Sequence, residues 1–188
     1  MRVKILNESG YTVALFGLGL SCGITSGMSY DNFSYPNKEK MDKMKQVAQN
    51  LCSKNNGENK FLESIQVWLD VTASRMFWQQ EATYRIGITR QSESTMKTLL
   101  KNELTTNDFN CELDKDILNK LNMAIKAKDF LFVKNHLPES FLQRRIISTN
   151  YKTIRNILYQ RKNHKLQEWR DFCKFLIKNL DCPEFLEV

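Results

Sequence analysis

One stretch of the chain alternates between apolar and polar positions with a period of two. Ile65, Val67, Leu69 and Val71 are apolar, and the residues between them are mostly polar. This alternation predicts a β-strand that is buried on one face. The next residues, 73–84, contain good helix formers and neither Gly nor Pro. We therefore expect the strand to lead directly into a helix.

Three further segments have the composition of short strands. Residues 2–6 and 11–16 are rich in β-branched and aromatic side chains, and they flank a Ser-Gly pair that is typical of a turn. Residues 141–148 form another short extended run. By contrast, residues 83–95 are polar and show no period, so we predict an irregular connection there.

Apolar residues at three- and four-residue spacing predict amphipathic helices in the remaining segments. Asn37 and Asn150 precede two of these segments, and asparagine is a favoured helix N-cap. No internal repeat divides the sequence, so the pattern predicts a single α+β domain over residues 1–188. The predicted helices cover residues 38–51, 113–130, 149–161 and 165–180.

The chain carries an excess of basic residues. It has 28 Lys and Arg against 21 Asp and Glu, which gives a formal net charge of +7. Such an excess favours a polyanionic partner, which is a nucleic acid, a phosphorylated small molecule or a nucleotide cofactor. A basic surface that only keeps the protein soluble agrees with this charge equally well. Charge alone therefore leaves the partner open.

Cysteine and histidine usage argues against disulfide and metal chemistry. The five cysteines are scattered without a CxxC pair, and the chain has only two histidines. We expect no metal site, and we expect the cysteines to be small buried residues of a cytoplasmic protein. The apolar segment 13–24 is too short to span a bilayer, and its glycines favour a strand and a turn. No membrane association is expected.

Basic and amide side chains gather near the C-terminus, although the familiar nucleotide and hydrolase motifs, such as GxGxxG, GK[ST] and HExxH, are absent. Asn150 and Arg161 would lie at the two ends of one apolar helix stripe, about 20° apart around the axis. Arginine forks and asparagine amides can grip a nucleotide. A helix cap and a guanidinium that reaches into solvent agree with the same spacing. The cluster consists of Lys134, Arg144, Arg145, Asn150, Lys152, Arg155, Asn156, Arg161 and Lys162.

An ordered set of short motifs runs through residues 136–169. They are Leu137-Pro138, Asn150-Tyr151-Lys152-Thr153, Asn156, Tyr159-Gln160-Arg161 and Gln167-Glu168-Trp169. In this order and spacing, they resemble the C-terminal region of the flavin-dependent thymidylate synthases. Residues 2–6, the Ser29-Tyr30 pair and the strand over residues 65–71 are similar to that family's front half. The resemblance extends over essentially the whole chain.

The resemblance implies an α+β fold with a mixed or antiparallel central sheet and flanking helices. It also implies a homotetramer whose active sites are shared between subunits. In that family the enzyme methylates C5 of a pyrimidine deoxynucleotide, dUMP to dTMP. Methylenetetrahydrofolate donates the carbon, and FAD and NADPH supply the reducing chemistry. No enzyme nucleophile is required, so the resemblance implies an enzyme without a catalytic cysteine.

Residue by residue, the resemblance implies two groups of site residues. Arg161 would hold the pyrimidine ring and serve catalysis. Lys134 and Lys152 stand where the family has arginine, which keeps the charge and loses the bidentate fork. The residues implied for the nucleotide are Gln80, Gln91, Ser94, Lys134 and Arg161. Those implied for the flavin are Glu63, Arg85, Ile86, Asn150, Lys152 and Asn156.

Residues 83–95 depart from the family's signature, RHRxxSxNxxSxR. The segment TYRIGITRQSEST keeps Arg85, while Tyr84, Arg90, Glu93 and Thr95 replace the histidine, the asparagine, the second serine and the final arginine. A second interpretation therefore stays open. It is a homologue without flavin chemistry that hydroxymethylates dCMP or dUMP, or that only binds a nucleotide or, less favoured, a nucleic acid.

Overall fold

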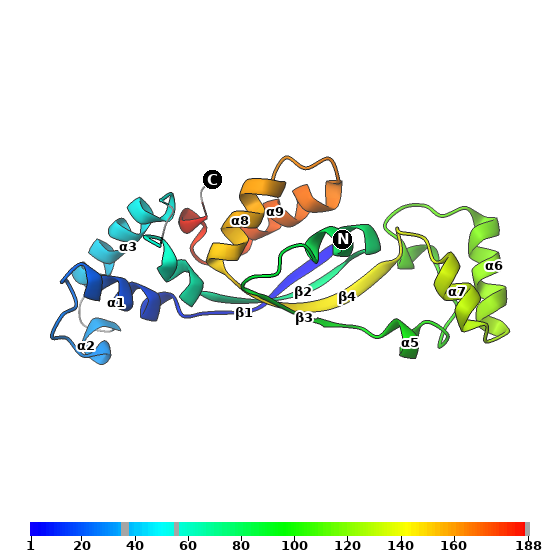
Figure 1. Ribbon diagram of the computed structural model, residues 1–188, viewed down its shortest axis with the longest axis horizontal. Helices are drawn as coiled ribbons and strands as arrows, with labels where there is room; N and C mark the ends of the chain where they lie inside the picture. The colour runs from blue at the N-terminus through cyan, green and yellow to red at the C-terminus, as the bar shows by residue number, and fades with distance from the viewer. Residues whose placement is uncertain (35–37, 55–56, 187–188) are drawn as a thin grey trace.

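A four-stranded antiparallel sheet runs through the middle of an elongated molecule (Figure 1). The computed structural model describes residues 1–34, 38–54 and 57–186. The strands lie in the order β1, β2, β4, β3, and every neighbouring pair is antiparallel. They are β1 (Arg2–Ser9), β2 (Gln66–Ser74), β3 (Ile88–Ser92) and β4 (Leu142–Asn150). The predicted α+β class with an antiparallel central sheet is confirmed.

The predicted alternation in β2 gives the sheet one buried face. Val67, Leu69 and Val71 are fully buried, and the residues between them are half-exposed. Helices α8 (Tyr151–Arg161) and α9 (Gln167–Asn179) cover this face (Figure 1). Full burial of each such aliphatic side chain contributes about 1.5–3 kcal/mol. This layer of the core therefore fixes where α8 lies above the sheet.

Helices α1 (Tyr11–Ser21), α2 (Tyr30–Ser34) and α3 (Lys38–Cys52) pack together at one end of the molecule (Figure 1). The strand predicted over residues 11–16 is wrong, because these residues begin α1. Gly10 ends β1 in the left-handed region at φ 92°. The segment that follows is apolar on all sides, and such a run does not distinguish a strand from a buried helix. Asn37, the predicted cap of α3, lies outside the described residues.

The opposite end of the molecule is a small helical lobe with its own core (Figure 1). It contains α5 (Thr95–Thr98), α6 (Lys115–Lys126) and α7 (Phe130–His136). The single helix predicted over residues 113–130 is therefore too long. Lys128 adopts a left-handed φ of 59°, which ends α6, and the Asp129 carboxylate then accepts the Phe132 N–H to cap α7. The lobe's core consists of Leu99, Leu104, Phe109, Leu121, Ile125, Val133 and Leu137.

The prediction of an irregular connection over residues 83–95 is wrong in its middle, where β3 pairs with β4. β3 is a polar edge strand, and its pairing partner lies more than fifty residues away in sequence. The helix predicted after β2 is α4 (Arg75–Glu81), and the predicted cap of α8 is confirmed, because the Asn150 side chain accepts the Thr153 N–H. The predicted C-terminal helix is α9.

None of the five cysteines, all of which lie in the described part of the chain, forms a disulfide, and three of them match the prediction of burial. Cys52, Cys173 and Cys182 are buried, whereas Cys22 and Cys111 are exposed, so the prediction of five buried cysteines is wrong for those two. Within residues 1–34, 38–54 and 57–186, no helix combines the length and the apolar character that crossing a bilayer requires.

Candidate functional site

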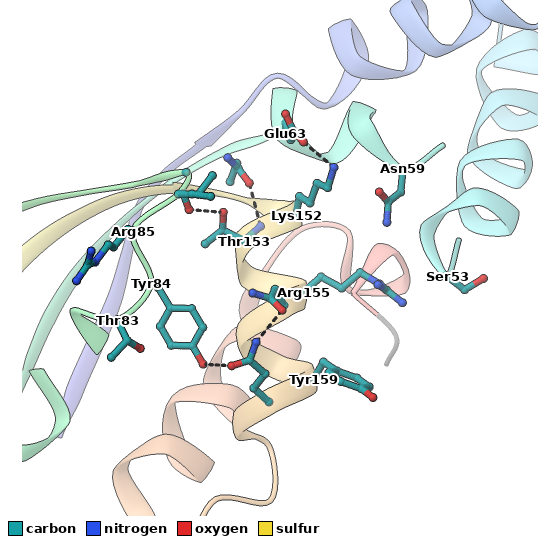
Figure 2. A pocket seen from close by; sticks show the side chains of 15 residues that line it. Ser53, Asn59, Glu63, Thr83, Tyr84, Arg85, Lys152, Thr153, Arg155 and Tyr159 are labelled. Atoms are coloured by element: carbon teal, nitrogen blue, oxygen red, sulfur yellow. Dashed lines mark hydrogen bonds and ion pairs between the residues drawn. The ribbon is translucent and has the colours of Figure 1, made fainter. Parts of the chain in front are cut away.

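A cavity of about 1050 Å³ opens beside α8, between a loop that follows α4 and a 3₁₀ helix at residues 60–64 (Figure 2). All six residues that the sequence predicts for the flavin line it: Glu63, Arg85, Ile86, Asn150, Lys152 and Asn156. They come from three separate segments of the chain. The remaining lining residues are Ser53, Asn59, Thr83, Tyr84, Gly87, Thr153, Arg155, Tyr159 and Gln160.

The first turns of α8 form one wall of this cavity, which we call the helical wall (residues 150–160). Asn150 ends β4 in an extended conformation and caps the helix through its bond from the Thr153 N–H, at 3.0 Å. Helical periodicity then turns Lys152, Asn156 and Tyr159 toward the cavity. Ile154, on the opposite side, is buried in the core.

The loop over residues 82–87 forms the facing wall, which we call the loop wall. Two hydroxyl groups hold its far end: Thr149 Oγ1 donates to the Gly87 carbonyl at 3.0 Å, and Thr153 Oγ1 donates to the Ile86 carbonyl at 3.2 Å. Gly87 has a φ of 69°, and a Cβ there would lie 2.4 Å from Thr153 Oγ1. Glycine at this position therefore permits the close approach of the loop to α8.

A buried ion pair holds the near end of the loop wall. Arg90 Nε lies 2.6 Å from Glu81 Oε2, and the Glu81 side chain is 1% exposed. Arg90 Nη2 also donates to the backbone carbonyls of Glu81 and Tyr84. Burial raises the pKa of the Glu81 carboxyl, and the neighbouring Arg90 opposes that shift. Arg90 thus connects α4, the loop and β3, a role that the sequence analysis missed.

Cationic side chains dominate the rim of the cavity. Arg85, Lys152 and Arg155 line it together with one carboxylate, Glu63. Lys152 Nζ lies 2.6 Å from Glu63 Oε1, and both groups are partly exposed. The N-terminus of α8 opens into the same space, and helix N-termini attract anions. The cavity is therefore suited to an anionic ligand with several hydrogen-bonding groups.

Arg161 and Gln80, which the sequence predicts for the nucleotide, lie together around one buried indole. Trp169 Nε1 donates to Gln80 Oε1 at 2.8 Å, and the Arg161 guanidinium lies 5.1 Å from the Trp169 ring centroid. Arg161 Nε donates to the Tyr84 hydroxyl at 2.8 Å. Among the described residues, no acceptor is bound to either Nη group of Arg161. The guanidinium lies over the Trp169 ring instead of extending into solvent. Because only its Nε is engaged by Tyr84, its two Nη groups can bind a ligand.

The other three residues predicted for the nucleotide lie elsewhere in the chain. Gln91 is on β3 opposite Ile146, and Ser94 precedes α5. Lys134, on α7, donates from Nζ to Thr95 Oγ1 at 2.7 Å. α5 and α7 belong to the helical lobe, at the far end of the sheet from the helical wall (Figure 1). Within one chain, Gln91, Ser94 and Lys134 therefore do not line the cavity.

Tyr84, Gln160 and Trp169 are components of the site that the sequence analysis did not single out as contributing side chains. In the sequence, Tyr84 is visible only as a departure from the family's signature. Its ring packs edge-on against Trp169, with centroids 6.0 Å apart, and its hydroxyl donates to Gln160 Oε1 at 3.1 Å. No pattern in the sequence reports these contacts, because they join segments more than seventy residues apart. In the described part of the chain, no three His, Cys, Asp or Glu side chains gather as a metal site would require.

Comparison with known proteins supports the fold. No protein-family profile and no curated protein matches the sequence. Among solved structures, a crystal structure of the flavin-dependent thymidylate synthase ThyX from Helicobacter pylori, complexed with FAD and dUMP, matches with a TM-score of 0.80 and 17% identity. That match covers 100% of this chain and 98% of the other. A second structure of ThyX from Helicobacter pylori with FAD and dUMP has a TM-score of 0.77 and 19% identity, and covers 99% and 97% of the two chains. The chain thus has the fold of flavin-dependent thymidylate synthases over its full length.

Proposed function

We propose that this protein is a divergent flavin-dependent thymidylate synthase that transfers a one-carbon unit to C5 of dUMP. One observation carries the proposal. The six residues implied for flavin binding come from separate segments, and all of them line one cavity of about 1050 Å³. Helix packing or solubility alone gives no reason for that coincidence.

The residues of the cavity suit FAD. Its volume of about 1050 Å³ is slightly above the range of about 300–1,000 Å³ that is typical of ligand and cofactor sites. Lys152, Arg155 and the N-terminus of α8 suit a diphosphate, and the amides of Asn150 and Asn156 suit polar ring edges. FAD would supply the reducing equivalent for the methyl group. The chain's own part is to bind and orient the reactants and to exclude water.

Arg161 suits the pyrimidine ring. Its Nε is fixed by the Tyr84 hydroxyl and its plane by Trp169. The two Nη groups then form a fork for a ring carbonyl. A charge-assisted hydrogen bond of this kind contributes about 1.5–3 kcal/mol. Gln80, held by Trp169, lies beside the same ring.

A site shared between subunits would account for the positions of Gln91, Ser94 and Lys134. Gln91, Ser94 and Lys134 do not line the cavity of their own chain. In the proposed homotetramer a neighbouring subunit supplies them to complete the nucleotide site. NADPH and methylenetetrahydrofolate are the proposed co-substrates, and the contacts described above assign no residues to them.

The altered segment 83–95 favours a second candidate: a homologue that binds a pyrimidine nucleotide without flavin, or that hydroxymethylates dCMP or dUMP. Tyr84 replaces the signature histidine, and its side chain is committed to Gln160 and Arg161. Thr95, in place of the final arginine, accepts a hydrogen bond from Lys134 instead of offering a guanidinium. Under this candidate, dUMP or dCMP stabilises the protein against heat and FAD does not.

The proposal is tested by turnover of the purified protein. With dUMP, FAD, NADPH and methylenetetrahydrofolate, we expect formation of dTMP and bound flavin that gives a yellow protein. Arg161→Ala should lower kcat/KM about 10- to 100-fold, from the loss of one charge-assisted contact. Lys165→Ala, an exposed change just beyond α8, is the matched control and should retain activity. Colourless protein that forms no dTMP or hydroxymethylated nucleotide would contradict the proposal.

A further inference from the structure

A chain of hydrogen bonds joins the proposed pyrimidine residue to the proposed flavin cavity. Arg161 Nε donates to the Tyr84 hydroxyl at 2.8 Å, and that hydroxyl donates to Gln160 Oε1 at 3.1 Å. Gln160 Nε2 then donates to Asn156 Oδ1 at 3.0 Å. Figure 2 shows the last two bonds running from Tyr84 to the face of α8 that lines the cavity.

The direction of this chain is imposed at one end. Arg161 Nε can only donate, so the Tyr84 oxygen accepts there, and the Tyr84 hydroxyl proton is donated to Gln160 Oε1. The Gln160 carbonyl therefore faces Tyr84, and its amide nitrogen faces Asn156. This orientation turns Asn156 Oδ1 toward Gln160 and leaves the Asn156 NH₂ group as a donor for the cavity. In this arrangement a permanent cation outside the cavity is linked by hydrogen bonds to the donor group that Asn156 offers inside it.

Tyr84 is held tightly enough to transmit this constraint. Its side chain is buried, with 8% of the residue exposed, and its ring packs against Trp169. Its backbone carbonyl accepts a hydrogen bond from Arg90, which is itself paired with Glu81. The Arg161 guanidinium lies 5.6 Å from the centre of the Tyr84 ring. These contacts hold the hydroxyl between Arg161 and Gln160.

We propose that Tyr84 is a positioning residue that couples the nucleotide site to the flavin site. Arg161 engages a pyrimidine while Tyr84 holds its Nε, and Tyr84 in turn fixes the amide of Gln160 and hence the donor of Asn156. A ligand at one end restricts the side-chain motion that remains along this series of hydrogen bonds, so each site is better ordered when the other is filled. Such coupling is reciprocal, so dUMP strengthens FAD binding by the same factor as FAD strengthens dUMP binding. This inference rests on the proposed function, since it uses that function's two ligands.

The test compares three variants of the full-length protein. Tyr84→Phe removes the hydroxyl and keeps the ring. Tyr84→His restores one acceptor and one donor, because a neutral imidazole has both. Tyr30→Phe is the matched control, because Tyr30 is an exposed tyrosine of α2 that does not line the cavity. The dissociation constants of FAD and dUMP are measured by calorimetry for each protein, with and without the other ligand.

We expect each ligand to strengthen the other at least about fivefold in the wild-type protein and in Tyr30→Phe. The factor should fall to one in Tyr84→Phe and recover in part in Tyr84→His. A merely structural role would weaken both affinities and leave the factor unchanged, so an unchanged factor in Tyr84→Phe overturns the inference.

A measurement without ligands keeps the inference separable from the proposed function. In the free protein, the Arg161 Nε–H should exchange with solvent at least about tenfold more slowly in the wild type than in Tyr84→Phe, because its hydrogen bond must open first. Equal exchange overturns the inference even if both ligands bind. Slow exchange with no binding of FAD or dUMP supports the hydrogen-bond chain and overturns the proposed function instead.

Discussion

The two walls of the cavity are built by different means. The helical wall follows local rules: Asn150 caps α8, and three- and four-residue spacing separates its cavity side from its core side. The loop wall has no repeating local structure. Arg90, Thr149 and Thr153, all from other parts of the chain, hold it against α8 and α4. The loop wall should therefore be the more sensitive of the two to single substitutions.

The largest effect should come from breaking the buried ion pair behind the loop wall. Arg90→Met leaves the Glu81 carboxylate buried without its partner and should lower the free energy of unfolding by about 3–5 kcal/mol. The double variant Glu81→Leu with Arg90→Met removes both charges and should recover most of this loss. Urea denaturation measures both changes.

The control for that experiment is the exposed pair of Lys126 and Glu103, which is 3.2 Å apart. Lys126→Met should change the free energy of unfolding by less than about 1 kcal/mol, because water screens exposed charges. If Arg90→Met costs no more than Lys126→Met, the loop wall is not held by this ion pair.

Gly87→Ala should have the next largest effect, about 1–3 kcal/mol of destabilisation, together with weaker FAD binding. Its Cβ would lie 2.4 Å from Thr153 Oγ1 and 2.8 Å from Asn150 Nδ2, which pushes the loop away from α8. Gly23 has the same φ of 69°, but a Cβ added there would have no atom within 4 Å. Gly23→Ala therefore reports the backbone strain alone and should leave FAD binding unchanged. Equal effects of the two substitutions on FAD affinity would refute the close approach as the cause.

Removing the cap of the helical wall should lower the free energy of unfolding by about 1 kcal/mol. Asn150→Ala deletes the acceptor for the Thr153 N–H, whereas Asn150→Asp keeps it. Thermal unfolding should therefore rank the wild type and Asn150→Asp above Asn150→Ala. An Asn150→Asp variant as unstable as Asn150→Ala would show that the cap contributes little.

The smallest effect should be on the reactivity of a thiol that lies behind the helical wall. Cys173 lies on α9 and is buried, and this burial raises the pKa of its thiol to about 12. At a pH near 8 that thiol stays protonated and unreactive, whereas the exposed Cys22 and Cys111 should react readily with a thiol reagent. Cys173 should remain protected in Gly87→Ala, because that change alters only the loop wall. Rapid reaction of Cys173 in the folded wild type would contradict the rigid packing of α8 on α9.

The same contrast explains how much the sequence could predict. The strand before α4, the helix α8 and its cap Asn150 follow local patterns, and the structure confirms them. The edge strand β3 could not be predicted, because its residues are polar and its pairing depends on β4. The Glu81–Arg90 ion pair could not be predicted either, because only the fold brings the two charges together away from water.

Part of the candidate site was also accessible from the sequence. The resemblance named six of the residues that line the cavity, and they come from three separate segments. It did not reveal that Tyr84, a departure from the family's signature, links Arg161 to Gln160. A substitution at a signature position indicates only that something changed, and the new contacts depend on neighbours that the fold supplies.

Binding of FAD to the purified protein decides whether this cavity is a flavin site. We expect one FAD per chain in a calorimetric titration of the wild type, and the same affinity in Lys165→Glu, whose charge change lies on an exposed residue outside the cavity. Lys152→Glu makes the same charge change inside the cavity and should weaken FAD at least about tenfold, by removing a cation and adding a repulsive carboxylate. No FAD binding by the wild type, or equal affinities in Lys152→Glu and Lys165→Glu, would contradict a flavin site between these two walls.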